Sequence, residues 1–322
     1  MQEIKTSKFF PIAKETLKYG EKYPYSIYRR VDERIFSLLL QKNEIFKKST
    51  QCFMVDENNT KLYVKDDDKQ YYQLYIQNHI RELLEDEKIN IDVKATFIKE
   101  IASETMNDLF ESDVNCENLS KINNIIDTTV KLILTEKNAM YSMLKVTSYD
   151  YYTYTHCIDV ATYAIGFGTY LNLSKEQLEL LGRAAMLHDI GKKKIPHSII
   201  TKNGKLTKEE FEIVKSHPTF SVEVLKESGE SNELLLKLIE QHHEKCDGTG
   251  YPKGLKEQEI EVLAKIISVC DVFNALTTRR TYKDRMSSYE AFKIMNNEMK
   301  NHLCALTLRN FICFMGCNKD LT

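Results

Sequence analysis

The sequence predicts a mainly α-helical protein that carries a small α+β domain at its amino terminus. From about residue 90 onward, apolar side chains recur with the helical period and no convincing strand pattern follows. Residues 1 to about 85 instead mix aromatic, β-branched and turn-rich stretches. We therefore expect two domains: residues 1–125, an α+β sensory or dimerisation region with a helical connector, and residues 126–322, a helical bundle.

The amino-terminal region combines strand and helix patterns. Residues 51–55 and 61–64 are short apolar runs on either side of a DENN turn, which is typical of a β-hairpin. Residues 35–40 and 71–84 show helical spacing. Residues 90–145 are expected to be helices that lead into the second domain. These patterns do not indicate what the region binds.

Three helix starts carry a capping box. In this motif a hydroxyl and a Glu or Gln three residues later satisfy the free amides of the first turn. The boxes begin at Ser174, Thr207 and Ser287, so we expect a helix to start at each of these residues.

The helix that begins at Ser174 ends in two residues that can hold a cation. Its apolar positions lead to His188 and Asp189, and Gly191 is expected to close the helix in the left-handed conformation. The negative end of the helix dipole favours a bound cation at this point. Lys192 would then lie beside the cation.

A helix over residues 257–278 places a carboxylate on its inward face. The residues at helical spacing on this face are Ile260, Ala264, Ile267, Asp271 and Asn274. A buried carboxylate is costly unless a positive group meets it. Asp271 is therefore expected to contact either a metal ion or a Lys or Arg side chain.

A further helix ends at His242 and His243. Its apolar face is expected to consist of Leu234, Leu235, Leu238 and Ile239. Residues 244–254 follow directly and contain three glycines and a proline, which predicts a shaped loop. The position of this loop, immediately after two histidines, makes it a candidate part of a site.

The histidines as a set indicate a metal site with hydrolytic chemistry. Five of the eight histidines of the chain lie between residues 156 and 243: His156, His188, His217, His242 and His243. The other three, His79, His197 and His302, are expected to be bystanders. Cys157 and Cys270 each adjoin a candidate ligand, but neighbours on a helix point about 100° apart, so neither thiol is expected to bind the metal.

Composition excludes several classes of protein. Lys and Arg number 45 against 47 Asp and Glu, so the formal charge of −2 offers no basic surface for duplex nucleic acid. No apolar run approaches the roughly 20 residues of a membrane helix, and the polar start lacks a signal peptide, so we expect a cytoplasmic protein without membrane contact. The eight cysteines form no CxxC pattern and are expected to be reduced.

Taken together, the motifs resemble the HD-GYP family, the helical metal-dependent phosphodiesterases of bacterial cyclic dinucleotide signalling. The matching segments are 187–192 (LHDIGK), 195–196 (IP), 217–218 (HP), 242–244 (HHE), 247–252 (DGTGYP), 254–255 (GL), 275–277 (ALT) and Arg280. They follow the family's order over roughly residues 150–290. The resemblance implies that residues 126–322 are an HD-domain helical bundle with catalytic activity.

The resemblance implies a centre of two divalent transition-metal ions. It implies Asp189 as the bridging ligand, His156, His188 and Asp271 on one ion, and His217, His242 and His243 on the other. Iron or manganese suits this mixture of imidazole and carboxylate, and zinc is also compatible. A hydroxide that bridges the ions would attack phosphorus in line. The implied reaction is hydrolysis of cyclic di-GMP to linear pGpG, GMP or both.

The resemblance also implies residues that bind the substrate. Lys192 would stabilise charge on the phosphoryl oxygens and so act in catalysis together with the bridging aspartate. Arg280 and Lys283 would hold the phosphates. Gly250 and Tyr251 belong to the Gly-Tyr-Pro turn, which serves either substrate access or contact with a cyclase of the GGDEF type.

Four positions depart from the family pattern. Tyr152 stands where some members have a glutamate that brings a third metal, so the resemblance implies two ions. Asn274 stands where aspartate is common, and Thr281 where proline is common. Ser221 replaces a usual glycine, and we expect consequences for packing only.

Three interpretations remain open. The first is a phosphodiesterase of cyclic di-GMP, with the amino-terminal domain as a sensor or homodimerisation module. The second keeps the chemistry but changes the substrate to another cyclic dinucleotide or phosphate ester. The third is a non-catalytic protein that binds nucleotide or serves as a scaffold. The complete set of ligand residues favours an enzyme.

Overall fold

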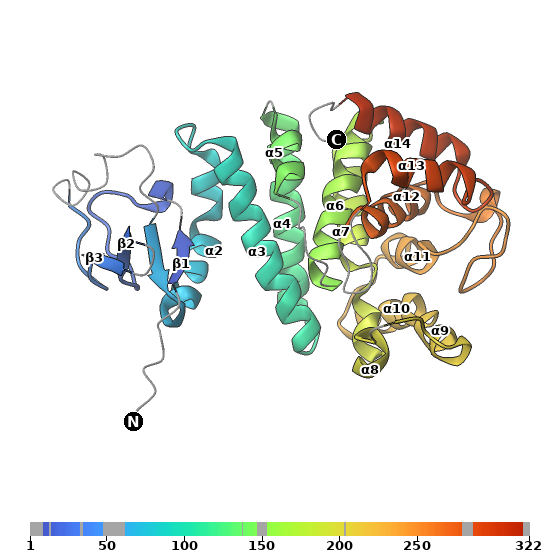
Figure 1. Cartoon of the computed structure of the whole chain (residues 1–322), viewed down its shortest axis with the longest axis horizontal. Coiled ribbons are helices and arrows are strands. Elements are labelled where there is room, and N and C mark those ends of the chain that lie inside the picture. Colours follow the sequence, from blue (N-terminus) through green and yellow to red (C-terminus); the bar gives the residue numbers. More distant parts are fainter. Residues whose placement is uncertain are drawn as a thin grey trace. The chain divides into compact units, whose positions relative to one another are not determined.

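The computed structural model describes residues 9–12, 14–32, 35–47, 62–136, 138–146, 153–202, 204–278 and 286–317. By internal contacts the chain divides into two compact units, Met1–Ile101 and Ala102–Thr322 (Figure 1). The described residues are mainly helical with one small antiparallel sheet, which confirms the predicted fold class.

The division between the units falls inside helix α3 (Ile91–Glu111), upstream of the limit that the sequence suggests. The connector helix α4 (Cys116–Thr135) packs against helices of the second unit, which explains why its residues group with that unit. The limit between residues 125 and 126, as a boundary between functions, stays a prediction.

The first unit is built on a four-stranded antiparallel sheet in the order β1-β4-β2-β3. Its strands are β1 (Phe9–Ile12), β2 (Ile27–Asp32), β3 (Ile35–Leu40) and β4 (Leu62–Lys65). Two short 3-10 helices are η1 (Lys14–Thr16) and η2 (Asp66–Asp68). Helix α2 (Lys69–Glu85) packs Tyr72 against Tyr25 and Tyr75 against Tyr23, edge to face, so an aromatic cluster forms the core.

Two of the three predictions that can be checked in this region are confirmed. Residues 62–65 form strand β4, as predicted, although the predicted partner at 51–55 lies outside the described residues. Helix α2 covers the predicted segment 71–84. The helix predicted at 35–40 is wrong, because these residues form β3 and pair with β2. An apolar run as short as IFSLLL fits both periods, and the partner strand decides between them.

In its described part, the second unit consists of helices and loops without a β-strand, and it begins with the end of α3. Its helices are α4, α5 (Ala139–Lys145), α6 (Thr153–Tyr170), α7 (Lys175–Leu187), η3 (Ile190–Lys194), α8 (His197–Ile200), α9 (Lys208–Val214), α10 (His217–Glu227), α11 (Glu233–Gln241), η4 (Glu257–Glu259), α12 (Val262–Thr277), α13 (Ser288–Asn297) and α14 (Ala305–Cys317). Helix α6 is buried along most of its length and packs against α7 and α12 (Figure 1). Phe167, Phe273 and Phe311 form an aromatic core. The ring centroid of Phe311 lies 5.2 Å from that of Phe167 and 5.2 Å from that of Phe273.

The predicted helix starts are confirmed. Ser174, Thr207 and Ser287 each form a complete capping box with the residue three positions later. The apolar face of α11 is confirmed except at Leu234, whose side chain is exposed.

The predicted role of Gly191 is wrong. Helix α7 ends at Leu187, and Gly191 lies inside η3 without the left-handed backbone that we expected. A side chain is excluded there for another reason: a Cβ would lie 2.2 Å from the backbone oxygen of His217 and 2.3 Å from the amide nitrogen of Ser221. Glycine is needed so that η3 can lie against the backbone of α10.

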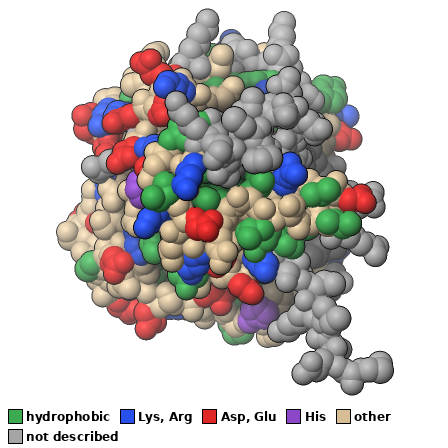
Figure 2. Space-filling model, turned by 90° about the vertical axis from the view of Figure 1, so that its left-hand side faces the viewer, with side chains coloured by type: hydrophobic (Ala, Val, Ile, Leu, Met, Phe, Trp, Pro, Cys, Tyr) green, Lys and Arg blue, Asp and Glu red, His purple; other side chains and the backbone are tan. Residues whose placement is uncertain are grey.

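One face of the molecule carries charges of both signs. On the face drawn in Figure 2, the acidic and basic side chains of the described residues are interspersed. Within the described ranges, every helix is too short or too polar to cross a lipid bilayer.

Candidate metal centre

Five structural segments bring the seven predicted ligand residues together. These residues are His156 in α6, His188 and Asp189 after α7, His217 at the start of α10, His242 and His243 after α11, and Asp271 in α12. All are buried except His243, whose side chain is 26 % exposed. The centre therefore opens to solvent on the side of His243.

The donor atoms of these residues gather in two groups. One group contains Asp189, His217, His242 and His243, and the other contains His156, His188 and Asp271. Within each group the donor atoms lie within 4.8 Å of one another. Apart from Asp189, which the resemblance assigns to both ions, the grouping divides these residues as the two implied ligand sets do.

Backbone carbonyls orient three of the imidazoles. The Nδ1 atoms of His188, His217 and His242 lie 2.7, 2.7 and 2.6 Å from the carbonyl oxygens of Ala185, Val214 and Ile239. Each carbonyl belongs to the residue three positions earlier, in a helical turn that precedes the histidine. Because a carbonyl oxygen only accepts, Nδ1 must carry the proton and donate it. When such a ring is neutral, its lone pair is on Nε2.

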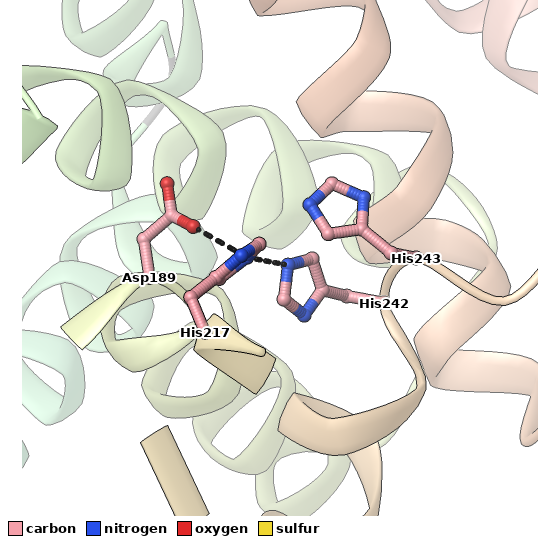
Figure 3. Close-up of side chains that lie close together, drawn as sticks. All are labelled: Asp189, His217, His242 and His243. Carbon is pink, nitrogen blue, oxygen red and sulfur yellow. Dashed lines mark hydrogen bonds and ion pairs between the residues drawn. The ribbon is translucent and has the colours of Figure 1, made fainter. Parts of the chain in front are cut away.

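The lone pairs of these rings converge. Nε2 of His217 lies 3.2 Å from Nε2 of His242 and 3.1 Å from Oδ1 of Asp189 (Figure 3). Burial first, and then the neighbouring imidazoles, hold the pKa of His242 well below its usual range, so this ring is neutral. Two lone pairs and a carboxylate oxygen at such distances require a cation or a proton between them.

In the second group, imidazole and carboxylate atoms also lie close together. Nε2 of His156 lies 3.0 Å from Oδ1 of Asp271, while Nδ1 of His156 lies 2.7 Å from the side-chain oxygen of the buried Asn274. Among the described residues, the cationic groups within 4.0 Å of Asp271 are imidazoles and not Lys or Arg. The salt bridge that the sequence left open is therefore not formed by the described residues.

Two buried atoms in the centre lack a hydrogen-bond partner among the described residues. They are Nε2 of His188 and Oδ1 of Asp189. The latter lies 3.1 Å from His217 without a hydrogen bond, because the lone pair of that ring faces it. Unpartnered donor atoms of the two groups are what bound metal ions would use, so the residues fit a metal centre of imidazole and carboxylate ligands.

Lys192 lies at the carboxylate that both groups approach. The 3-10 turn of η3 brings its Nζ to 2.5 Å from Oδ2 of Asp189. Burial would raise the pKa of Asp189, but the ammonium group of Lys192 and the imidazole of His188 outweigh burial and hold this pKa well below its usual range. Asp189 is therefore ionised, as a ligand must be.

The Gly-Tyr-Pro turn lies at the open side of the centre. The ring of Tyr251 is 4.9 Å from the ring of His243 and 6.4 Å from that of His217, measured between centroids. The predicted phosphate-binding residues Arg280 and Lys283 lie outside the described residues, and so do Tyr152 and Thr281. Of the predicted substrate-binding residues, Lys192 and Tyr251 lie at the centre, and Gly250 lies against the backbone of Glu244 and Lys245.

The thiol of Cys157 is closer to the centre than the helical argument suggested. Its sulfur lies within 4.8 Å of donor atoms of His188 and Asp189, because it approaches the backbone of Asp189 at the end of α7. Burial raises the pKa of this thiol well above its usual range, so it stays protonated and is a poor ligand. Cys270 is buried and joins none of the groups formed by described residues.

The three remaining histidines lie elsewhere. His79 stacks on Tyr75, His197 contacts Thr201, and His302 lies 3.7 Å from Asp247. None of the three belongs to the donor groups among the described residues.

Sequence reasoning missed three supporting residues. Asn274 was expected on the inward face of its helix and noted as a departure, but its contact with Nδ1 of His156 was not expected. The hydroxyl of Ser221 donates to the carbonyl oxygen of His188 and accepts from the amide of Gly191, so its role is more than packing. Glu244 is buried beside the two histidines and binds backbone amides. Polar residues at buried helical positions next to ligands were the available signal.

Comparison with known proteins identifies the family. Residues 122–304, more than half of the chain, match a family model described as an HD domain. A cyclic di-GMP phosphodiesterase of Pseudomonas aeruginosa is 35 % identical over 192 residues, which are 60 % of this chain and 46 % of that protein. A cyclic di-GMP phosphodiesterase of Thermotoga maritima is 47 % identical over 114 residues, 34 % of this chain and 30 % of that protein.

Two further proteins extend the comparison. A 3'3'-cGAMP-specific phosphodiesterase of Vibrio cholerae is 36 % identical over 148 residues, 46 % of this chain and 32 % of that protein. The solved structure of an HDG"Y"P protein from Bdellovibrio bacteriovorus has a TM-score of 0.68 at 21 % identity and covers 96 % of this chain and 100 % of that chain, which shows a shared fold. The chain spans less than half the length of these curated relatives. The match over residues 122–304 and the ordered motifs within it show that the chain belongs to the HD domain family, in its HD-GYP group.

Proposed function

We propose that this protein is a metal-dependent phosphodiesterase that hydrolyses cyclic di-GMP to linear pGpG, GMP or both. The observation that carries the proposal is the convergence of seven imidazole and carboxylate residues in two groups that meet at Asp189. Relatives named as cyclic di-GMP phosphodiesterases in two bacteria support the choice of substrate.

The two donor groups would hold two divalent ions. His156, His188 and Asp271 would hold one ion, His217, His242 and His243 the other, and Asp189 would contact both. Iron or manganese fits these ligands, and zinc is compatible with them. When bound, such a pair supplies a nucleophilic hydroxide near neutral pH and stabilises an in-line displacement at phosphorus.

The residues of the chain would bind and orient the diester. Lys192, 2.5 Å from Asp189, carries positive charge to the place where charge develops on the phosphoryl oxygens. Tyr251 bounds the open side next to His243 and would contact the nucleotide with its ring. Arg280 and Lys283 are proposed to hold the phosphates from the segment beyond α12.

A second candidate keeps the chemistry and changes the substrate. The Vibrio cholerae relative named for 3'3'-cGAMP is about as similar to this chain as the Pseudomonas aeruginosa protein named for cyclic di-GMP. The metal ligands do not contact a base, so they do not discriminate between these substrates. A non-catalytic nucleotide-binding or scaffold protein would bind either compound without turnover. Contact of the Gly-Tyr-Pro loop with a GGDEF-type cyclase and homodimerisation through the amino-terminal domain belong to the same proposal.

One experiment tests these candidates. The protein is purified without oxygen, analysed for metal, and given cyclic di-GMP or 3'3'-cGAMP, with products separated by chromatography. We expect linear pGpG or GMP from cyclic di-GMP, and no product with Asp189→Ala. Turnover of 3'3'-cGAMP alone would identify the second candidate. Tight binding of either nucleotide without product from the metal-loaded protein would instead support a scaffold.

A further inference from the structure

A buried carboxylate follows directly after the two histidines of α11. Glu244 is only 3 % exposed, although it lies at the start of the loop that runs from α11 to η4. A buried carboxylate without hydrogen-bond partners would cost several kcal/mol. The partners of Glu244 therefore show what the residue does.

Both carboxylate oxygens of Glu244 accept hydrogen bonds from the backbone of the same loop. The amide of Lys253 donates to Oε1 over 2.7 Å, and the amide of Leu255 donates to Oε2 over 2.8 Å. Hydrogen bonds from amides to an ionised carboxylate are stronger than neutral ones. Glu244, at the start of the loop, thus holds the backbone of residues 253 and 255 near the end of the loop.

The loop also returns to Glu244 through close backbone packing. A Cβ at Gly250 would lie 2.3 Å from the amide nitrogen of Lys245 and 2.6 Å from Cα of Glu244. Gly254 has a φ of +67°, which other residues rarely adopt. The chain therefore meets the start of the loop at residue 250 and again at residues 253 to 255.

Tyr251 lies between these two points of contact. Its amide donates to the carbonyl oxygen of His243 over 3.2 Å, and its ring is 4.9 Å from the ring of His243. The position of the tyrosine ring thus depends on the loop closing around Glu244.

We propose that Glu244 is a positioning residue: its two carboxylate oxygens hold the loop closed, so that Tyr251 covers His243 and binds substrate in one geometry. This inference rests on the proposed function, in which Tyr251 contacts the nucleotide. Glu244 acts through the loop and not through the metal ions. Its loss should therefore weaken substrate binding and leave metal content unchanged.

The chain offers a matched control on the same loop. Glu240 lies in α11 and its Oε2 is 2.6 Å from Nζ of Lys253. Glu240 thus contacts the exposed side chain of Lys253, whereas Glu244 accepts from the backbone amide of Lys253. If loop closure depends on the two amides, Glu240→Gln should have no effect where Glu244→Gln has one.

The first measurement follows the loop itself. The chain contains no tryptophan, so Tyr251→Trp introduces a single indole at the position of interest. The NH₂ group that Glu244→Gln introduces cannot accept a hydrogen bond, so one of the two backbone amides loses its acceptor and the loop loosens. In the Tyr251→Trp background we therefore expect Glu244→Gln to shift the indole emission to longer wavelength and to lower its anisotropy. Glu240→Gln should leave both values unchanged. Identical spectra for the two variants would overturn the proposal.

The second measurement follows the reaction. Glu244→Gln should raise KM for cyclic di-GMP about tenfold, with kcat within about threefold and the same metal content as the wild type. Glu244→Asp, whose shorter side chain cannot reach both amides, should behave likewise and serves if the amide variant does not fold. A fall in kcat with loss of metal would refute the role assigned here. Absence of turnover by the wild type would refute the proposed function, while the fluorescence result would still test the loop.

Discussion

Asp189 is approached by imidazoles from both halves of the metal centre. Oδ1 lies 3.1 Å from Nε2 of His217, and Oδ2 lies 3.3 Å from Nε2 of His188. We expect Asp189→Ala to abolish turnover and to lower the content of both metal ions, because each loses a ligand. His197→Ala is the control, since that ring lies outside the donor groups. Metal analysis and an activity assay that find equal losses in the two variants would show that the histidines are wrongly assigned.

The pH dependence of the metal-free protein follows from His243. Although 26 % of its side chain is exposed, the ring is largely enclosed, and this loss of solvation lowers its pKa from the usual 6.5 to about 3. Because the unfolded chain takes up a proton that the folded chain does not, the free energy of unfolding should fall as the pH decreases from about 6.5 toward 3. Urea denaturation of chelated protein at several pH values measures this slope. His243→Gln should make the slope shallower, and an unchanged slope would contradict the assignment.

Lys192 and Arg280 should differ in kinetics. Lys192 touches Asp189, so its charge is placed to act during attack, and Lys192→Ala should lower kcat by about 10²–10³. Arg280→Ala should mainly raise KM, because that residue is predicted to hold phosphate equally in the ground and transition states. Steady-state kinetics with cyclic di-GMP distinguishes the two. The reverse pattern, or loss of metal in either variant, would reject this division of roles.

At the scale of elements, one hydroxyl joins η3 to α10. Ser221 in α10 donates to the carbonyl oxygen of His188 over 2.9 Å and accepts from the amide of Gly191 over 2.8 Å, on either side of Asp189. Because α10 begins at His217, this contact sets the spacing between Asp189 and that histidine.

Removal of the hydroxyl should therefore cost both stability and metal affinity. Ser221→Ala leaves the buried amide of Gly191 without its partner, so the free energy of unfolding should fall by about 1–3 kcal/mol. Titration with metal should show weaker binding by the group that contains His217. Thr219→Ala, at an incompletely buried position two residues earlier in α10, is the control and should change neither value. Wild-type stability and affinity in Ser221→Ala would contradict the inference.

Helix starts and short strands differ in how far the local sequence determines them. Helix starts were predictable because a capping box is local chemistry, as at Ser174. Strand β3 was not, because its short apolar run depends on pairing with β2. The true constraint on Gly191 was hidden for a similar reason: it comes from α10, which lies about 30 residues later. The candidate metal ligands could be proposed from their residue types, whereas their hydrogen bonds to Ala185 and Asn274 required the fold.

For the whole molecule, we predict about two transition-metal ions per chain. The two donor groups contain seven residues, enough to hold two ions with Asp189 shared. Metal analysis of protein purified under metal-replete conditions should give this ratio, and chelation should lower the melting temperature, since ions bind the native state. A ratio of one or zero would refute a centre of two ions.

The hydrogen bonds from the histidines to backbone carbonyls bear on which metal ion the centre binds. His188, His217 and His242 are oriented by backbone carbonyls of the helical turns that precede them, and these hydrogen bonds need no metal ion. Such a site is a rigid template, so an emptied centre should refill without refolding. Affinity for divalent ions then follows their intrinsic order, and availability decides which ion is bound. The concentrations of iron, manganese and zinc around the protein would then decide which ion the centre holds. A change in these concentrations would exchange one bound ion for another.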